Sequence, residues 1–196
     1  MSSTRGGRQD EAYMRAALRL ARESKTLPYP NPWVGCVITR GSTIVGHGFH
    51  RGPGTNHAEV EAMAEAGDRS RNATLYVSLE PCCHVGRTPP CTNAIVRAGI
   101  RRVVYAMRDP NPAVAGRGAA ALKSNGIEVK QGVLKTEARA LNEVYFKFRH
   151  TGLPFVTVKV ATSLDGKIAT RTGESHWITD AAARRRAREL RSQHQA

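Results

Sequence analysis

One histidine, one glutamate and two cysteines in this sequence have the types and spacing of a catalytic zinc site. His57 is followed two residues later by Glu59, and two thiols, Cys82 and Cys91, come further along the chain. Zinc prefers thiolate and imidazole ligands, and a catalytic site keeps one of four positions open for water. We therefore expect His57, Cys82 and Cys91 to bind one zinc ion per chain. Glu59 would then stand beside the open position.

The chemistry of such a site follows from the charge of the metal. Zinc makes a bound water acidic enough to ionise near neutral pH, and a nearby carboxylate such as Glu59 can carry the released proton. The pattern His-x-Glu followed by Pro-Cys-x-x-Cys is the signature of zinc-dependent base deaminases. This sequence departs from it, because position 85 is Val85 and the next thiol is Cys91. The loop between the two thiols is therefore longer than in the short signature.

Two other interpretations share the same residues. A structural zinc module would use Cys83 or His84 as a fourth ligand, but Glu59 would then have no task beside a closed site. A tRNA adenosine or nucleotide deaminase would keep the zinc core. The long loop and the lack of an obvious RNA-binding helix count against it. We expect Cys83 to point away from the metal as a small buried side chain, and Cys36 to lie in the core.

Composition narrows the class of protein. The chain has 196 residues, a net charge of +14 and a hydrophobic fraction of 40%, which suits one domain with part of a second. No apolar run approaches the roughly 18 residues of a membrane span, and no signal peptide is evident, so we expect a cytoplasmic protein. The positive charge attracts anions. Aromatic residues make up only 6% of the chain. Platforms that bind single-stranded nucleic acid combine basic and aromatic side chains, so the positive charge gives little support to nucleic-acid binding.

The elements that must position these residues alternate along the chain. Hydrophobic periodicity and turn residues predict the following order: helix 10–24 capped by Asp10, an apolar stretch 31–38 and a returning strand 43–49, helix 57–67, strand 74–79, helix 92–98, strand 102–106, helix 118–124, strand 127–130 and helix 135–148. The apolar side of the last helix is expected to hold Leu141, Val144, Tyr145 and Phe148. We expect Cys82 to lie at a helix start. Strands that alternate with helices imply a layered α/β domain with parallel pairing in its second half.

A boundary is expected at 151–154, where Gly152 and Pro154 interrupt the pattern. Beyond it we expect a strand at 155–160 and a helix at 181–191. Residues 151–196 are too few for a second α/β domain. This piece should therefore dock on the first domain or remain loosely ordered.

The long loop resembles a known family. The run Glu-Pro-Cys-x-His-x-Gly-Arg-Thr-Pro-Pro-Cys over residues 80–91, with His-Ala-Glu ahead of it, is similar to the deaminase domain of the bacterial riboflavin-biosynthesis bifunctional deaminase–reductase. That resemblance implies a cytidine-deaminase-like fold, a three-layer α/β/α domain with a mixed central sheet. It implies a zinc-dependent pyrimidine deaminase domain over 1–150 and the truncated start of a reductase-like domain over 151–196.

The resemblance also implies contacts to a pyrimidine substrate. Asn31 matches a position where an Asn bonds the ring, His50 a second contact, and Asp109 and Asn111 a later substrate loop. An Asn side chain offers both a donor and an acceptor, as reading a heterocycle edge requires. The alternative for Asn31, Asp109 and Asn111 is that each only forms a turn.

His84 and Arg87 match positions that hold a ribosyl phosphate. Both offer cationic donors within a glycine-bearing loop, as a phosphate requires. The implied substrate is 2,5-diamino-6-ribosylamino-4(3H)-pyrimidinone 5′-phosphate, hydrolysed at C2 with release of ammonia, and Glu59 moves the protons. The expected partner is thus a phosphorylated pyrimidine, with no membrane contact, nucleic acid unlikely and a homo-oligomer possible.

Residues 153–196 resemble the start of the family's reductase domain. In that resemblance Ala161 and Trp177 meet NADP, and Ser175 and Arg191 meet the substrate. Most of the reductase domain has no counterpart here, so we expect no reduction by this chain alone and NADP binding only with a complete reductase domain.

Overall fold

A computed structural model of the chain describes residues 3–23, 29–192 and 194. The elements in chain order are α1 (Ser3–Arg22), β1 (Gly35–Arg40), β2 (Thr43–Phe49), α2 (Ala58–Ala66), the 3-10 helix η1 (Gly67–Ser70), β3 (Thr74–Leu79), α3 (Cys91–Arg97), β4 (Arg102–Met107), α4 (Arg117–Ser124), β5 (Glu128–Gln131), α5 (Lys135–Leu141), α6 (Glu143–Thr151) and α7 (Ala181–Ser192). The chain divides into two compact units, Met1–Pro154 and Phe155–Ala196. Assigning a deaminase domain to 1–150 and a reductase-like segment to 151–196 remains a prediction.

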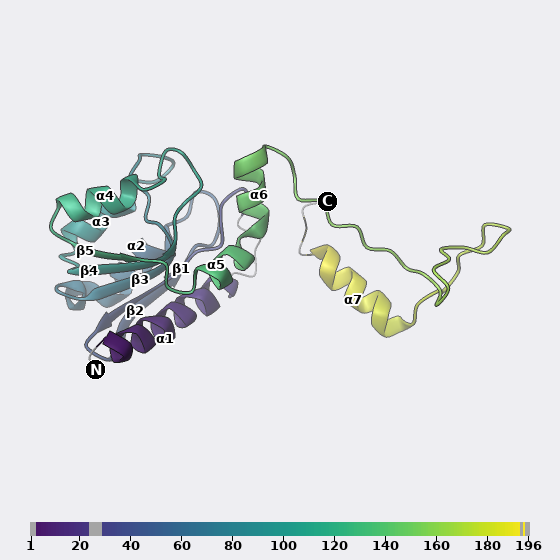
Figure 1. The fold of residues 1–196 in the computed structure, drawn as a ribbon, viewed down its shortest axis with the longest axis horizontal. Helices are drawn as coiled ribbons and strands as arrows, with labels where there is room; N and C mark the ends of the chain where they lie inside the picture. Colours follow the sequence, from purple (N-terminus) through teal and green to yellow (C-terminus); the bar gives the residue numbers. More distant parts are fainter. Residues whose placement is uncertain (1–2, 24–28, 193, 195–196) are drawn as a thin grey trace. The chain divides into compact units, whose positions relative to one another are not determined.

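The first unit is built on one mixed sheet of five strands, in the order β2-β1-β3-β4-β5. β1 is antiparallel to both of its neighbours, whereas β3, β4 and β5 are mutually parallel. Helices α1 and α5 pack on one face of the sheet, and α2, α3 and α4 cover the other (Figure 1). The predicted three-layer α/β/α fold with a mixed central sheet is therefore confirmed.

Alternating side chains along the strands supply a separate core to each face. In β1, Cys36 and Ile38 point toward α2, while Val37 between them packs under α1. In β4, Val103 packs on the same side of the sheet as α2, and Val104 packs on the same side as α1. Successive side chains of a strand point to opposite faces. Because helices cover both faces of this sheet, all five side chains are buried. Both layers of helices are thus held by apolar contacts to one sheet.

One edge of this sheet collects polar residues. β2, β3 and β4 run in the same direction, since β1 is antiparallel to β2 and β3 and β3 is parallel to β4. Their carboxyl ends therefore meet at a single edge, where β1 also begins. Open α/β sheets bind ligands at this edge. The residues that follow or precede these strand ends include His50, Glu80 and Asp109.

Helix α2 lies directly against the backbone of β2. A Cβ atom added at Gly46 would lie 2.2 Å from the carbonyl oxygen of Ala62, and one at Gly48 would lie 2.5 Å from that of Ala58. Neither distance leaves room for a side chain, so the two glycines allow the helix to sit this close to the strand. The N-terminal end of α2 is thereby placed over the polar edge of the sheet.

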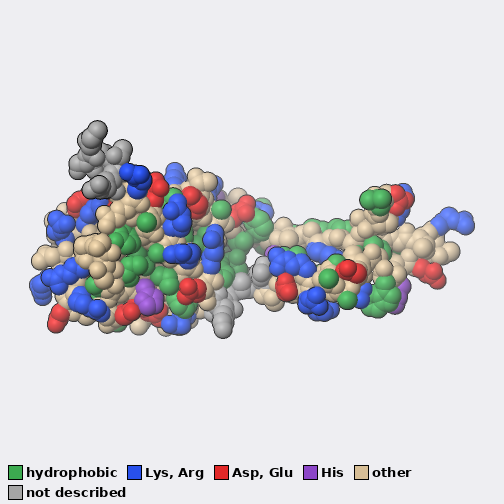
Figure 2. Space-filling model, turned by 90° about the horizontal axis from the view of Figure 1, so that it is seen from below, with side chains coloured by type: hydrophobic (Ala, Val, Ile, Leu, Met, Phe, Trp, Pro, Cys, Tyr) green, Lys and Arg blue, Asp and Glu red, His purple; other side chains and the backbone are tan. Residues whose placement is uncertain are grey.

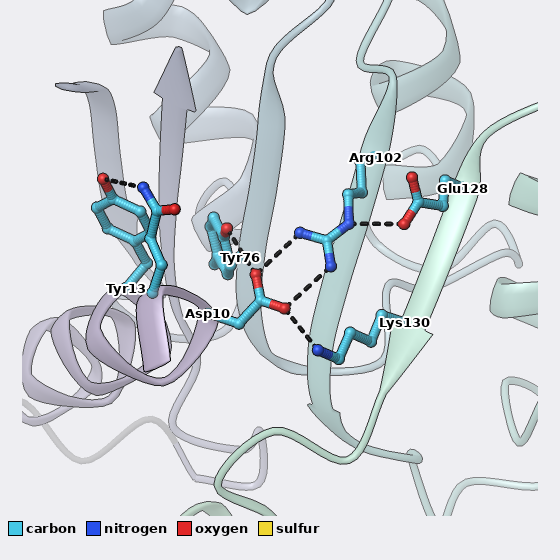
Figure 3. Close-up of polar contacts among 7 residues, drawn as sticks. Asp10, Tyr13, Tyr76, Arg102, Glu128 and Lys130 are labelled. Carbon is cyan, nitrogen blue, oxygen red and sulfur yellow. Dashed lines mark hydrogen bonds and ion pairs between the residues drawn. The ribbon is translucent and has the colours of Figure 1, made fainter. Parts of the chain in front are cut away.

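The predicted first helix is wrong at its start. It begins at Ser3, so Asp10 lies inside α1 and does not cap it; the predicted end at Ser24 lies outside the described residues. Asp10 is 3% exposed and turns toward the sheet. Its two carboxylate oxygens accept hydrogen bonds from the Arg102 guanidinium at 2.9 Å each, from the Lys130 ammonium at 2.7 Å and from the Tyr76 hydroxyl at 2.9 Å (Figure 3). Instead of capping α1, Asp10 therefore connects this helix to three strands, β3, β4 and β5.

The predicted helix 135–148 is two helices in the structure. The break falls at Asn142, which is buried and whose side chain bonds the backbone of Trp33 in both directions. Its Oδ1 accepts from the Trp33 N–H at 2.7 Å, and its Nδ2 donates to the Trp33 carbonyl at 2.9 Å. This pairing holds the segment before β1 against the junction of α5 and α6. Of the apolar side predicted for this helix, Tyr145 is buried, but Phe148 is 46% exposed and Phe146 is buried instead.

The second unit contains helix α7, as predicted, but the predicted strand at 155–160 is wrong. The structure gives these residues no strand pairing, and Val156, Val158 and Val160 are 57–77% exposed. A strand requires a neighbour for its N–H and C=O groups. The alternating valines therefore have the pattern of a strand without its partner.

On the face shown in Figure 2, Lys and Arg side chains are interspersed with acidic and apolar ones over both units. Among the described helices, none combines the length and apolar character that crossing a membrane requires.

The Asp10 contacts predict a pH-dependent contribution to stability. Burial acts to raise the pKa of Asp10, but hydrogen bonds from Arg102, Lys130 and Tyr76 outweigh it and lower the pKa to about 2 from the usual 3.8. A carboxylate with a lowered pKa stabilises the fold above its unfolded pKa, and this contribution is lost as the pH falls toward 2. Asp10→Asn should therefore lose roughly 2–3 kcal/mol in urea unfolding at pH 7, the range for hydrogen bonds to charged groups.

The matched control is Glu128→Gln, which changes a largely exposed carboxylate that contacts the same Arg102 at 2.8 Å. Exposed ion pairs contribute at most about 1 kcal/mol, so this variant should unfold close to the parent. The difference between Asp10→Asn and parent should shrink at about pH 2.5, where the parent carboxylate is becoming protonated. Equal stability of Asp10→Asn and parent at pH 7 would contradict the prediction.

Candidate active site

Three potential metal ligands converge at the polar edge of the sheet. The ligand atoms of His57, Cys82 and Cys91 all lie within 4.8 Å of one another. Nδ1 of His57 is 3.2 Å from Sγ of Cys91 and 3.5 Å from Sγ of Cys82. A tetrahedral zinc with bonds of about 2.0 Å to nitrogen and about 2.3 Å to sulfur separates such donors by roughly 3.5 Å. The residues present therefore fit a zinc ion, and the predicted triad is confirmed.

The protonation of the two thiols also suits a cation. A hydrogen bond from the Cys91 thiol lowers the pKa of Cys82 to about 4, while the Cys82 thiolate raises that of Cys91. Without a metal the pair thus shares one proton between two sulfur atoms. A thiolate is the form that ligates metals, and a divalent cation would stabilise both sulfurs in that form.

Each ligand comes from a different local structure. His57 is the N-cap residue of α2, and Cys91 is the first residue of α3. Cys82 was expected at a helix start, but it lies in the irregular segment that precedes α3. Its position is fixed by hydrogen bonds, because the Cys91 N–H donates to its Sγ at 3.3 Å and the Thr92 N–H donates to its carbonyl oxygen at 3.1 Å. These bonds close the base of the long loop.

His57 has a second contact through its other ring nitrogen. Its Nε2 lies 3.3 Å from Oγ1 of Thr88. With a metal ion on Nδ1, Nε2 would carry the proton and donate it to the hydroxyl oxygen. Outer partners of this kind orient a ligating imidazole. Thr88 belongs to the same loop as Cys82 and Cys91, so the loop holds the histidine as well as supplying the thiolates.

Glu59 is the buried carboxylate of the site. It is 4% exposed, lies two residues after His57 in the first turn of α2, and lines the same pocket as His57. Burial raises the pKa of Glu59 to about 7, and the nearby Cys82 thiolate adds to the rise. A bound cation at the triad acts in the opposite direction. A carboxyl group whose pKa lies near neutrality can both accept and release a proton.

A cavity of about 360 Å³ opens over the triad and Glu59. It gathers all six predicted contacts to the pyrimidine substrate, although they come from segments far apart in the sequence. The predicted residues that line it are Asn31, His50, His57, Glu59, Cys82, His84, Arg87, Asp109 and Asn111. Cys91 is fully buried and does not line it. The roles of the substrate contacts remain predictions.

Asn31 and His50 form a pair whose orientation can be deduced. Nδ1 of His50 lies 3.2 Å from the carbonyl oxygen of Asn56, which can only accept, so Nδ1 carries a proton. Burial lowers the pKa of His50, which favours the neutral ring, so its Nε2 accepts a hydrogen bond. Nδ2 of Asn31 supplies that bond at 2.8 Å. His50 thus has both nitrogens engaged and fixes which end of the Asn31 amide faces it.

Asp109 and Asn111 form the turn that was the alternative to a binding role. Oδ1 of Asp109 accepts from the Asn111 N–H at 2.8 Å and from the Tyr145 hydroxyl at 3.0 Å. Oδ1 of Asn111 accepts from the Ala113 N–H at 3.2 Å. These bonds are typical of Asp and Asn in turns. Both side chains still line the cavity, so shaping the loop and contacting a ligand are compatible.

The loop that joins the two cysteines carries the predicted phosphate contacts. Arg87 is exposed at its tip, and His84 is half-buried at the cavity wall. Among the described residues, none provides a hydrogen-bond partner for the buried Nδ1 of His84. A buried polar nitrogen without a partner is costly, and a ligand oxygen at this position would satisfy it.

Three residues of the site had no predicted role. Glu80 and Tyr145 are buried polar residues at the cavity wall, and Thr88 contacts His57. Glu80 stands in the Glu-Pro-Cys motif, which was the available signal. Tyr145 was placed only on the apolar side of a helix, since its hydroxyl partner Asp109 lies far away in the sequence.

Cys36 lies in the core as predicted, whereas Cys83 points away from the triad as predicted but is half-buried rather than buried. Cys36 is fully buried in β1, and Sγ of Cys83 lies 3.7 Å from the carbonyl oxygen of Ala113, outside the triad. The described cysteines form no disulfide.

The predicted reductase-like contacts lie in the second unit. Ala161 is half-buried, whereas Ser175 and Arg191 are exposed and Trp177 is 65% exposed. The guanidinium of Arg184 lies 4.1 Å above the Trp177 ring. Their functions remain predictions.

Comparison with known proteins agrees with this geometry. A family model described as the cytidine and deoxycytidylate deaminase zinc-binding region matches residues 7–107, and a model of the RibD C-terminal domain matches 154–196. Riboflavin biosynthesis protein RibD of Escherichia coli (strain K12) is 50% identical over 188 residues, covering 96% of this chain and 51% of that protein. The chain spans about half the length of the curated relatives it matches.

Solved structures give the same result. The structure of Acinetobacter baumannii RibD, form 2, superposes with a TM-score of 0.92 at 46% identity and covers 97% of this chain and 53% of that one. A Thermotoga maritima protein, named a diaminohydroxyphosphoribosylaminopyrimidine deaminase/5-amino-6-(5-phosphoribosylamino)uracil reductase, gives 0.87 at 42% identity and covers 95% and 54%. The chain belongs to the cytidine and deoxycytidylate deaminase zinc-binding family and, within it, to the RibD group.

Proposed function

We propose that the first unit is a zinc-dependent deaminase that hydrolyses 2,5-diamino-6-ribosylamino-4(3H)-pyrimidinone 5′-phosphate in riboflavin biosynthesis. The observation that carries the proposal is that three features meet at one cavity. They are the buried carboxyl group of Glu59, the triad that fits zinc, and the Asn31 amide, which can hydrogen-bond the edge of a heterocycle. The Thermotoga maritima relative is named for this substrate. Hydrolysis replaces the C2 amino group by a carbonyl and consumes one water for each ammonia released.

Zinc held by His57, Cys82 and Cys91 would lower the pKa of a water molecule in the cavity. Glu59 would accept a proton from that water and pass it to the ring nitrogen. It would then take the second proton from the hydroxyl left on C2 and give it to the amino group, which departs as ammonia. Burial of Glu59 keeps bulk water from competing for these protons. One carboxyl group can serve both steps because it is ionised when it accepts each proton and protonated when it releases it.

Asn31 and the loop 82–91 would hold the substrate over Glu59. With Nδ2 of Asn31 engaged by His50, its Oδ1 remains to accept from an N–H of the pyrimidine edge. His84 and Arg87 would bind the ribosyl phosphate. The loop that carries them also carries two metal ligands, so the phosphate and the reacting carbon would be held at a fixed separation.

The second unit is proposed to add no NADPH-dependent reduction by itself. Residues 154–196 match the RibD C-terminal domain model, but Ser175, Trp177 and Arg191 are exposed. An exposed set of contacts lacks the concave, desolvated surroundings of a cofactor site.

The metal assignment predicts the effect of removing one ligand. Cys91→Ser should lose most of the zinc, because a serine hydroxyl is a poor substitute for a thiolate. Elemental analysis of the purified variant measures this loss directly. Cys83→Ser is the matched control and should keep one zinc per chain. Loss of zinc from Cys83→Ser, or full occupancy in Cys91→Ser, would favour a different set of ligands.

The proton-transfer role predicts the effect of an amide at position 59. Glu59→Gln should keep zinc and fold but lose about 10²- to 10⁴-fold in kcat, the usual contribution of a general acid–base group. Glu61→Gln is the control, since Glu61 lies on the same helix but pairs with Arg51 outside the cavity. Steady-state rates of ammonia release compare the two. A Glu59→Gln variant as fast as the parent would exclude Glu59 as the proton carrier.

Phosphate recognition predicts a difference between two substrates. Arg87→Ala should weaken binding of the phosphorylated pyrimidine by about 2 kcal/mol, as expected for a charge-assisted hydrogen bond. Binding of the dephosphorylated nucleoside should change little. Arg97→Ala, an exposed position on α3 outside the cavity, is the control.

Isothermal titration of both ligands measures the two losses, and a salt titration with tRNA tests the polynucleotide alternative. Equal losses for the two small ligands, together with tight, salt-sensitive tRNA binding and adenosine deamination, would overturn the riboflavin-pathway proposal.

A further inference from the structure

Glu80 is a buried carboxylate at the cavity wall that the proposed chemistry does not use. It is 3% exposed and stands two residues before the ligand Cys82. Its carboxylate accepts hydrogen bonds from backbone N–H groups of a different segment of the chain.

Three such N–H groups converge on the two oxygens. Oε2 of Glu80 accepts from Asp109 at 3.4 Å and from Gly116 at 3.0 Å, and Oε1 accepts from Ala119 at 3.0 Å. Asp109 and Gly116 are the two ends of the loop between β4 and α4. One carboxylate therefore closes that loop at both ends, in addition to bonding the first turn of the helix that follows.

The same contact caps helix α4. Gly116 is its N-cap residue and provides no side chain for capping, and Ala119 is at the third helical position. The first N–H groups of a helix have no partner within it, and a carboxylate placed there is favoured by the helix dipole. Glu80 takes this role from 36 and 39 residues away in the sequence.

Backbone contacts on either side of the carboxylate leave little freedom between the two segments. The Glu80 N–H donates to the Met107 carbonyl at 2.9 Å. A Cβ atom added at Gly118 would lie 2.1 Å from the carbonyl oxygen of Pro81. The start of α4 and the stretch leading to Cys82 are therefore in direct backbone contact, with the Glu80 carboxylate beside it.

We propose that Glu80 is a positioning residue that fixes the Asp109–Gly116 loop relative to the metal-ligand loop, and so sets where Asp109 and Asn111 stand in the cavity. The part of this inference that concerns substrate binding rests on the proposed function. It predicts that disturbing this contact weakens substrate binding while leaving the metal in place, because the metal ligands are held by separate bonds of Cys82, Cys91 and Thr88.

The variant Glu80→Gln has the shape of the parent but only one acceptor oxygen, and its NH₂ group faces N–H donors. Hydrogen–deuterium exchange of the peptide covering 109–119 should become about 10- to 100-fold faster, the ratio for loss of one hydrogen bond to a charged group. Exchange over α2 should stay as in the parent. KM for the phosphorylated pyrimidine should rise about tenfold, kcat should change by less than about threefold, and zinc should remain at one per chain.

A second variant approaches the contact from the other side. Gly118→Ala pushes α4 away from Pro81 without changing Glu80, and it should give the same rise in KM with zinc retained. Glu137→Gln, an exposed position on α5, is the control for the loss of one carboxylate. Expected melting temperatures are lower for both test variants, so stability alone does not decide the outcome.

Unchanged exchange over 109–119 and unchanged KM in both variants would overturn the inference, as would loss of zinc with the rise in KM, which would assign Glu80 to the metal site. The exchange measurement needs no substrate. If the parent failed to deaminate the pyrimidine, the proposed function would be refuted. The exchange rates over 109–119 would still show whether Glu80 holds the loop.

Discussion

The close approach of helix α2 to strand β2 is the constraint on which the site depends. Gly46 and Gly48 leave no side chain between the two backbones, so the helix has essentially one position along and above the strand. That position places His57, its N-cap residue, and Glu59, in its first turn, beside Cys82, which follows the carboxyl end of β3. The loop after β3 then needs only to bring its two thiols to a point already defined by the helix. The helix fixes the positions of His57 and Glu59, and the loop is long enough to bring Cys82 and Cys91 to them.

Three buried carboxyl groups in one small unit show how partners decide the behaviour of a residue type. Asp10 faces two cations and has its pKa lowered to about 2. Glu59 is buried beside a thiolate and has its pKa raised to about 7. Glu80 accepts hydrogen bonds from backbone N–H groups at the start of α4 and caps that helix. The same chemical group thus has a different role in each environment.

The sequence predicts best where neighbours along the chain decide the structure. The hairpin at 43–49, the strand at 74–79 and the His57-to-Gly67 helix follow from local periodicity and glycines, and the zinc triad follows from ligand spacing. Prediction failed where distant partners decide. Asp10 was assigned a cap because its cationic partners lie on β4 and β5, and the break at Asn142 depends on the backbone of Trp33. The strand expected at 155–160 has the right alternation, but pairing is a property of two segments and cannot be read from one.

The Asp10 cluster has a consequence for how the chain acquires its fold. Asp10 is separated by 92 residues from Arg102 and by 120 from Lys130. A chain made from its N-terminus therefore carries α1 for most of the synthesis of this unit before the cations that neutralise its buried carboxylate exist. Contacts over such separations cost the most entropy to close and form late in folding. Until β4 and β5 have formed, the buried carboxylate of α1 lacks both of these cationic partners, so the contacts that hold α1 by its charge are completed only with the last strand of the sheet.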